Sequence, residues 1–198
     1  MTETPNHKPR LILASASPRR VQLLDQLGLA ADAIIPADID ETEIPGELPV
    51  PYAERMARSK GAVIAAQNPN DYVLAADTVV AVGRRILPKA LTPDDVRMCL
   101  NLISGRRHVV LTGVALNMPD GTQRFRLSTT NVKVKRLTKV EIDAYVDSGQ
   151  GIGVAGGYMF QKKFAGYIPW IGGSNSGIVG LPLYETAQLL AGAGLLKP

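Results

Sequence analysis

Short apolar blocks separated by polar loops mark the beginning of the chain as alternating strand and helix. Leu11–Ala14 is a continuous apolar run, typical of a buried strand, and a loop of small hydroxyl residues follows it. Ser17 as N-cap, Pro18 at the first helical position and Gly28 as the stop predict a helix after that loop. Ala33–Ile35 then predicts a second strand.

The next segment predicts one long helix and two strands with a polar interruption between them. Helical periodicity runs over Tyr52–Gln67 and ends at Asn68-Pro69-Asn70. Tyr72–Ala76 and Val79–Val82 predict strands, and Asp77-Thr78 separates them. Residues 84–87 then predict the return arm of a hairpin that turns at Gly83.

The second half of the chain predicts a long hairpin and three more helices. The hairpin pairs Arg107–Asn117 with Thr122–Lys135 around a Pro-Asp-Gly turn. The helices are predicted at Pro93–Ile103, Thr138–Ser148 and Leu183–Ala191. In the second of these, Thr138 is followed three residues later by Glu141, which predicts a capping box.

Residues 149–180 hold more than half of the chain's 19 glycines. Such a density predicts loops that pass close to other groups, with short strands near Tyr158–Phe160 and Tyr167–Ile171. Because strands and helices alternate and both hairpins and crossovers are required, the pattern predicts an α/β fold with a mixed sheet and flanking helices.

Length and composition limit the architecture further. The 198 residues suit one compact domain, or two lobes that share a core, so we expect a flexible polar tail at 1–9 and a single domain at 10–198. A 45% apolar and 20% charged composition argues against wholesale disorder and against a coiled coil. A single cysteine excludes a disulfide framework and a thiolate zinc site.

Neither targeting signals nor charge indicate a membrane or nucleic-acid partner. No apolar run approaches the roughly 18 residues of a membrane helix, and the first ten residues lack a signal core, so we expect a cytoplasmic protein. The net charge of +4 is compatible with a phosphate-bearing partner without requiring one. Only 5% of residues are aromatic, which does not favour nucleic-acid binding. The basic segment Lys133–Arg136 alternates with Val134 and indicates either a solvated edge or a contact with a polyanion.

Ser15–Arg20 carries the clearest chemical signal. A strand, a hydroxyl-rich loop and a helix N-terminus form an anion site, because the backbone N–H groups there are unpaired and the helix dipole is positive. Arg19 and Arg20 interact unfavourably with that dipole, and each destabilises the helix by roughly 0.3–1 kcal/mol unless a bound polyphosphate offsets their charge. The alternative interpretation is two solvated arginines.

Carboxylates supply the second signal. Asp77 interrupts an apolar run, so it is either paired, bound to a metal or placed at a cleft, or it caps a turn. Asp38–Glu43 is an acidic loop whose oxygens suit Mg²⁺ together with phosphate oxygens and waters, although a solvated loop explains it equally simply.

Lys60 lies on the apolar side of the predicted helix, which carries Tyr52, Met56, Val63 and Ile64. A lysine there either extends to water or points into a pocket toward an anion, and Lys89 is a weaker candidate for the same role. His7 and His108 are the only histidines, and His7 lies in the tail, so the general base is a carboxylate, a lysine or a water activated by a metal.

Several of these segments together resemble the Maf family of nucleoside triphosphate pyrophosphatases, first named as septum-formation inhibitors. The segments that carry the resemblance, in the family's order, are Leu13–Arg20, Ala76–Val80, Ser104–His108, Thr112–Val114 and Val179–Leu183. The resemblance covers residues from about 10 to 195. It implies a mixed α/β fold similar to the inosine-triphosphate pyrophosphatases, with two lobes around a central cleft, and hydrolysis of the bond between the α- and β-phosphates.

The resemblance also assigns roles to residues. It implies that Asp77 is the catalytic proton acceptor and that Glu41 and Asp77 hold a divalent cation, Mg²⁺ or Mn²⁺. The substrate-binding residues it implies are Ser15, Arg19, Arg20, Lys60, Thr78, Lys89 and Gln161. Thr78 and Gln161 match the branch selective for dTTP and UTP, whereas the 7-methyl-GTP branch has glutamine after the aspartate. Relatives commonly form dimers, so a homodimer is one expected assembly.

The chain departs from the family pattern at three places. Ala90 replaces the usual proline, and Val154 replaces a lysine. Met159, Phe160 and Lys162, which surround Gln161, differ from the family's residues at those positions. These departures favour an alternative function, a nucleotide- or nucleic-acid-binding regulator of cell division with little catalysis. They concern the expected base pocket rather than the catalytic carboxylate.

Overall fold

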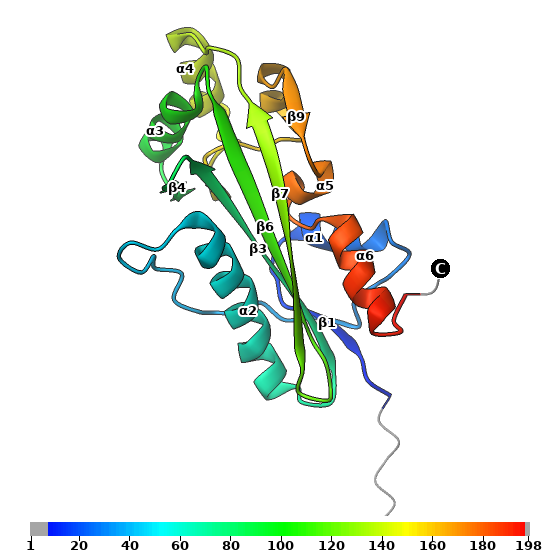
Figure 1. Cartoon of the computed structure of the whole chain (residues 1–198). Helices are drawn as coiled ribbons and strands as arrows, with labels where there is room; N and C mark the ends of the chain where they lie inside the picture. The colour runs from blue at the N-terminus through cyan, green and yellow to red at the C-terminus, as the bar shows by residue number, and fades with distance from the viewer. Residues whose placement is uncertain (1–7, 197–198) are drawn as a thin grey trace, which may run out of the picture.

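A mixed seven-stranded sheet forms the centre of the computed structural model, which describes residues 8–196 (Figure 1). Its strands are β1 (Leu11–Leu13), β2 (Ala33–Ile34), β3 (Tyr72–Val82), β4 (Arg85–Leu87), β6 (Arg107–Asn117), β7 (Gln123–Lys133) and β9 (Trp170–Gly172). The order is β2-β1-β3-β6-β7-β9, and β4 pairs with β3. β1 is parallel to β2 and β3, and the other pairs in this sheet are antiparallel. A small second sheet pairs β5 (Lys89–Ala90) with β8 (Val154–Ala155). Most of the expected tail at 1–9 lies outside the described residues.

Helices flank the sheet on both faces. They are α1 (Pro18–Asp25), α2 (Pro49–Gln67), α3 (Pro93–Ile103), α4 (Lys139–Asp147), α5 (Asn175–Val179) and α6 (Leu183–Gly192), with a 3-10 helix η1 at Lys163–Tyr167. In Figure 1, α2 lies against one face, α1 and α6 lie against the other, and α3 and α4 gather at the far end of the long strands. The predicted mixed α/β fold with flanking helices is thus confirmed.

β3 sends alternate side chains to the two faces, as the period of a strand requires. Val73 and Ala75 pack with Ile64 of α2, while Leu74 and Ala76 pack with leucines of α1 and α6. The same alternation places Asp77 on the α2 face and Thr78 on the opposite face. These two neighbouring polar residues therefore belong to different surroundings.

The predicted break at Asp77-Thr78 is wrong, because β3 continues through both residues. Asp77 lies opposite Gly113 of β6 and Thr78 lies opposite Thr112, so the ladder with β6 is uninterrupted. The sequence suggested a break because a buried carboxylate is costly without a partner. In the structure Lys60 supplies that partner, so the strand need not end.

The other edge of β3 is open at the same point. β1 pairs with β3 only at Tyr72, Val73 and Leu74, and β4 pairs with it only from Val80 to Val82. Asp77 and Thr78 lie between these two pairings. The strands on this edge therefore separate where the polar residues lie, which leaves room for a binding cleft.

Turn and capping chemistry gave the most accurate sequence predictions. Thr138 and Glu141 form the predicted capping box of α4, and β6 and β7 form the predicted long hairpin. α2 begins at Pro49 rather than at Tyr52, since proline suits the first turn of a helix. Val63, expected on the buried side of α2, is 38% exposed.

The glycine-rich segment differs from its prediction. Tyr158–Phe160 is not a strand; instead β8 is followed by a turn at Gly156 and Gly157, both with positive φ. The predicted strand at Tyr167–Ile171 is present only as β9, because η1 extends to Tyr167. The positive-φ glycines turn the chain repeatedly in this segment and interrupt the predicted strands.

None of the helices within residues 8–196 is sufficiently long and apolar to traverse a bilayer.

Candidate active site

A cleft of about 740 Å³ opens at the free edge of β3. The β1–α1 loop, the acidic loop, α2, β3 and the glycine-rich segment all contribute to its walls. Every residue predicted to act at the site lines it: Ser15, Arg19, Arg20, Glu41, Lys60, Asp77, Thr78, Lys89 and Gln161. Elements distant in sequence thus bring these side chains to one cavity, which we call the central cleft.

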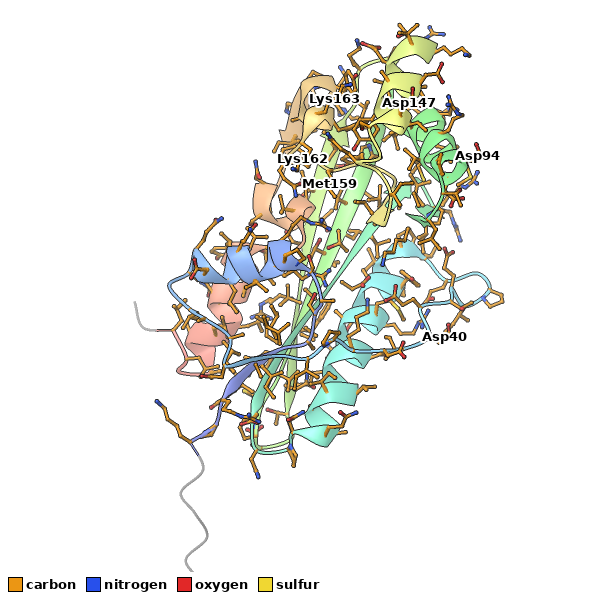
Figure 2. The ribbon with its side chains drawn as sticks, turned by 180° about the vertical axis from the view of Figure 1, so that it is seen from behind. Asp40, Asp94, Asp147, Met159, Lys162 and Lys163 are labelled. Atoms are coloured by element: carbon orange, nitrogen blue, oxygen red, sulfur yellow. The ribbon has the colours of Figure 1, made fainter. Side chains whose placement is uncertain are left out.

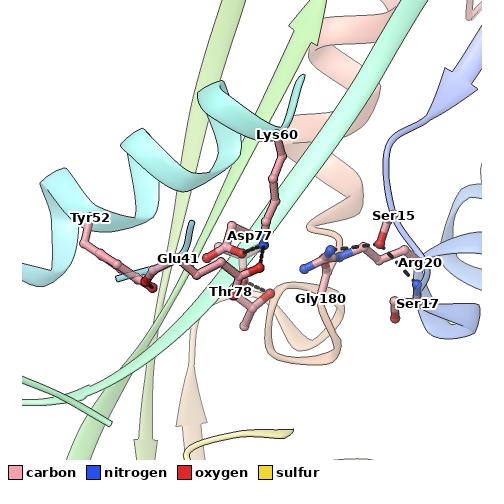
Figure 3. A network of polar contacts seen from close by, with 10 residues as sticks. Ser15, Ser17, Arg20, Glu41, Tyr52, Lys60, Asp77, Thr78 and Gly180 are labelled. Carbon is pink, nitrogen blue, oxygen red and sulfur yellow. Dashed lines mark hydrogen bonds and ion pairs between the residues drawn. The ribbon is translucent and has the colours of Figure 1, made fainter. Parts of the chain in front are cut away.

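Arg20 is fixed at the α1 end of the central cleft. Its Nη1 donates to Ser15 Oγ at 2.9 Å, and its Nε donates to the Gly180 carbonyl oxygen at 2.8 Å (Figure 3). Ser17 occupies the predicted N-cap position, but its side chain makes no cap hydrogen bond. Burial lowers the pKa of Arg20, and Arg19 lowers it further, whereas Asp77 and Glu41 raise it. Arginine side chains keep their positive charge in proteins, so Arg20 contributes a cation to the central cleft.

Lys60 joins the two candidate carboxylates. Its Nζ lies 2.6 Å from Asp77 Oδ1 and 2.7 Å from Glu41 Oε1 (Figure 3). The Lys60 and Asp77 side chains are each only 11% exposed, whereas Glu41 is half exposed. Removing one member of a buried ion pair costs on the order of 3–5 kcal/mol, because the other charge is left without a partner. Lys60 therefore points into the pocket rather than toward bulk water.

Two glycines allow α2 to approach the sheet closely enough for this contact. A Cβ at Gly113 would lie 2.8 Å from the Ala53 carbonyl oxygen and 3.1 Å from the Ala57 side chain. A Cβ at Gly61 would lie 2.2 Å from the side-chain amide of Asn117. Because Gly113 is directly opposite Asp77, the close approach occurs beside the catalytic candidate.

Tyr52 is a cleft residue whose polar role the sequence did not indicate. Its hydroxyl donates to the Glu41 carbonyl oxygen at 2.7 Å. Burial raises the pKa of Tyr52 to about 12, and the charges of Asp77, Glu41 and Glu43 contribute. The phenol therefore remains a hydrogen-bond donor at neutral pH. Its position on an apolar helix face concealed the contact, since only the fold brings the acidic loop to it.

The hydroxyl of Thr78 contacts a neighbouring threonine. Thr112 Oγ1 lies 2.8 Å from the Gly177 carbonyl oxygen and donates to it, and it lies 3.1 Å from Thr78 Oγ1, which accepts from it. Because a hydroxyl has one proton, Thr112 shares that proton between the two acceptors. These contacts tie the Thr78 side chain to β6 and α5 at the wall of the central cleft.

The remaining wall contains the departures from the family pattern. Ala90 and Val154 are direct cross-strand partners in the β5–β8 sheet, so these two departures lie at one place. Met159, Phe160 and exposed Gln161 follow on the cleft wall. Figure 2 shows Met159 close to Lys162 on the glycine-rich segment. The departures lie on a different wall from Asp77 and Lys60, which come from β3 and α2.

His108 supports this wall from behind. Its Nε2 lies 2.7 Å from the hydroxyl of Tyr158, a residue that lines the central cleft. His108 is 3% exposed, and burial lowers its pKa to about 4. The histidine is neutral at physiological pH and belongs to the packing of the wall.

The donor set suits a hard divalent cation. Glu41 and Asp77 direct oxygens at one point, where they already hold the Lys60 ammonium, and each carboxylate has a second oxygen for another cation. No cluster of three or more His, Cys, Asp or Glu side chains arranged for a metal occurs within residues 8–196. Mg²⁺ is usually held by one or two carboxylates with phosphate oxygens and waters, so two carboxylates fit it when a nucleotide is bound.

Comparison with known proteins agrees with this geometry. Residues 10–193 match the family model described as Maf-like protein. A dTTP/UTP pyrophosphatase of Caulobacter vibrioides is 58% identical over 94% of this chain and 96% of its own length. The dTTP/UTP pyrophosphatase of Gluconobacter oxydans is 54% identical over 96% of this chain and 90% of its own.

A solved structure supports the fold. The structure of a HAM1 protein from Coxiella burnetii aligns with a TM-score of 0.52 at 17% identity, covering 93% of this chain and all of that one. At this level of identity the likeness concerns the fold alone.

Proposed function

The chain belongs to the family of Maf-like proteins, and from this premise we propose that it is a nucleoside triphosphate pyrophosphatase acting on dTTP and UTP. The reaction adds water across the bond between the α- and β-phosphates and yields a nucleoside monophosphate and pyrophosphate. The names of the curated relatives favour this activity over a regulator with little catalysis.

One observation carries the proposal. Asp77, Lys60, Glu41 and Arg20 converge on a single cleft at the open edge of β3, although they come from four separate segments. A carboxylate beside fixed cations is the arrangement that hydrolysis of a phosphoanhydride requires: one group accepts a proton, and the others stabilise negative charge.

The cations are proposed to bind the triphosphate. Arg20 has its Nε and Nη1 fixed by Gly180 and Ser15, so its remaining N–H groups are available to phosphate oxygens without further ordering of the side chain. Arg19 and Lys89 line the same cleft and add positive charge. These groups neutralise the charge that develops on the departing pyrophosphate.

Asp77 is proposed to accept the proton of the attacking water. Lys60 holds Oδ1 in place, which fixes the orientation of the carboxylate on the sheet. β3 is buried and apolar before Asp77, at Ala75 and Ala76, and again from Val79 onward, which restricts movement of the strand at the carboxylate. General bases of this kind typically contribute about 10²–10⁴-fold to the rate.

Glu41 and Asp77 would hold a Mg²⁺ or Mn²⁺ ion, which supplies Lewis-acid polarisation of the phosphate when it is bound. Lys60 keeps the two carboxylates directed at the same point.

Thr78 and Gln161 are proposed to contact the base. The N3 position of uracil or thymine is an N–H donor, whereas N3 of cytosine is an acceptor. Thr78 Oγ1, which the Thr112 hydroxyl contacts, is proposed to accept the N3–H of uracil or thymine, and a site that binds this group disfavours cytosine, which lacks it.

The test is a substrate panel in which wild-type protein is supplied with Mg²⁺ or Mn²⁺ and each of dTTP, UTP, CTP, GTP and ATP. Pyrophosphate and inorganic phosphate are measured separately. Pyrophosphate released in amounts equal to the monophosphate, with dTTP and UTP preferred, supports the proposal. Release of inorganic phosphate alone, or no release from any triphosphate, contradicts it.

A further inference from the structure

The acidic loop extends to residue 48 and lies against the central cleft with little apolar surface buried. None of its three large apolar side chains is fully buried: Ile39 is half-buried, and Ile44 and Leu48 are 54% and 39% exposed. Burial of apolar surface therefore contributes little to its position. Glu41 nevertheless reaches Lys60 at 2.7 Å, so other contacts must hold the loop.

Two residues of α2 make those contacts. The Tyr52 hydroxyl donates to the Glu41 carbonyl oxygen at 2.7 Å, and Arg55 Nη2 donates to the next carbonyl, that of Thr42, at 3.0 Å. Arg55 also binds the Glu47 carboxylate with both Nε and Nη2, at 2.7 and 2.5 Å. The loop is thus held at its middle and at its end by one helix.

The same helix carries Lys60. Tyr52 and Arg55 are about one turn apart, and Lys60 follows about two turns after Tyr52 on the same helix. Figure 3 shows the Tyr52 and Lys60 side chains extending from this helix, with Glu41 between them. Arg55 also lies over the Tyr52 ring, 5.3 Å from its centroid, which fixes both side chains relative to each other.

We propose that Tyr52 and Arg55 are positioning residues that fix the acidic loop by its backbone, so that Glu41 is presented to Lys60 and Asp77. Arg55 donates hydrogen bonds to the Thr42 backbone carbonyl and to the Glu47 carboxylate. Tyr52 donates to the Glu41 backbone carbonyl. They act on the reaction through Glu41, so this part of the inference rests on the proposed function. The fixed loop sets how readily the cleft accepts a divalent cation with the nucleotide.

The first test needs no substrate. Hydrogen exchange of the loop amides, among them those of Thr42 and Ile44, is measured in the free wild-type protein and in Tyr52→Phe and Arg55→Gln. Loss of one such hydrogen bond should accelerate exchange by about fivefold, since a net bond contributes about 1 kcal/mol. Exchange at wild-type rates in both variants would overturn the proposal.

Matched controls separate loop fixation from general effects. Arg58→Gln removes another guanidinium of α2, one that binds Glu54 and Gln123 instead of the loop. Tyr184→Phe removes the hydroxyl of a tyrosine on α6 that is 73% exposed. Both controls should leave exchange in the acidic loop unchanged; acceleration equal to that in the test variants would contradict a specific role for Tyr52 and Arg55.

The second test places the effect on Glu41. Tyr52→Phe should lower kcat/KM for dTTP by about 5–10-fold and raise the Mn²⁺ concentration for half-maximal activity, in line with a lost hydrogen bond of 1–1.4 kcal/mol. In a Glu41→Ala background the same change should have no further effect. An equal loss in both backgrounds would overturn the proposal. If wild-type protein releases no pyrophosphate, the proposed function fails, and the exchange experiment still decides whether the loop is fixed in this way.

Discussion

Lys60 shows how one charged side chain organises the central cleft. Its ammonium contacts a buried carboxylate on the sheet and a half-exposed carboxylate on a loop. Sequence periodicity placed it on the apolar side of a helix, where a lysine needs either water or an anion. The structure gives it two anions, so its position is explained by partners that lie far away in sequence.

Arg20 should distinguish triphosphate from monophosphate. Arg20→Ala removes a guanidinium that Ser15 and Gly180 hold in place, and we expect it to weaken dTTP binding by at least about tenfold. Binding of dTMP should change much less, because the product lacks the terminal phosphates. Calorimetric titration of both nucleotides measures this, and equal losses would show that Arg20 does not contact those phosphates.

Thr112 should control base choice through Thr78. Thr112→Val removes the hydroxyl that donates to Thr78 Oγ1 at 3.1 Å, so Thr78 is no longer held in position toward the base. We expect the UTP-to-CTP ratio of kcat/KM to fall about tenfold. Thr186→Val is the matched control, since Thr186 is fully buried and its hydroxyl makes no hydrogen bond within residues 8–196. An unchanged ratio in Thr112→Val would contradict a role for this contact in base choice.

His108 should make stability depend on pH. Its folded pKa of about 4 lies below its ordinary value of 6.5 because of burial, so the unfolded chain takes up the proton first. Stability therefore falls as the pH drops from about 6.5 to 4 and levels off below that. Between pH 7 and 5 wild type should lose on the order of 1–2 kcal/mol more unfolding free energy than His108→Gln. Denaturant titration at both pH values measures this, and parallel losses would rule out a contribution from His108.

At the scale of elements, α2 is the component that assembles the site. It packs on β3 and β6 through small residues, carries Lys60 near its middle, and binds the acidic loop near its N-terminus. Its distance from the sheet therefore sets the distance between the Lys60 ammonium and the Asp77 carboxylate. The glycines at the contact are the sequence features on which that distance depends.

Gly113→Ala should disturb both stability and activity. The new methyl would lie 2.8 Å from a backbone oxygen of α2, so the helix must move outward. We expect a loss of about 1–3 kcal/mol in unfolding free energy and a lower kcat, as Lys60 withdraws from Asp77. Gly166→Ala is the control, because a Cβ there meets no atom within 4 Å and its φ is not positive. Wild-type kcat in Gly113→Ala would argue that helix spacing does not govern the chemistry.

Elements with local signals could be predicted from the sequence, and those that depend on distant partners could not. The capping box at Thr138 and the turn before β7 follow from residues within a few positions. The continuity of β3 through Asp77 depends on Lys60, and the location of the acidic loop depends on Tyr52 and Arg55. Local patterns contain no information about such contacts, so they predict two strands in place of β3 and do not predict the contacts of the acidic loop.

At the scale of the whole molecule, the sheet brings distant segments to one edge. β1 and β4 leave the middle of β3 uncovered, and the β1–α1 loop, the acidic loop and the glycine-rich segment surround the opening. That the candidate site residues share one cleft could be predicted, because the family motifs mark them. Their mutual contacts could not, since these depend on the packing of α2 and on the register of β3 with β6.

The central claim is that Asp77 performs the chemistry in a cleft that binds nucleotide through other groups. Pyrophosphate release from dTTP by wild type and by Asp77→Asn, with dTTP binding measured on the same preparations, tests it directly. We predict that the variant binds dTTP but releases pyrophosphate at least about 10²-fold more slowly. Turnover in the variant at the wild-type rate would show that the proton goes elsewhere and would contradict the account.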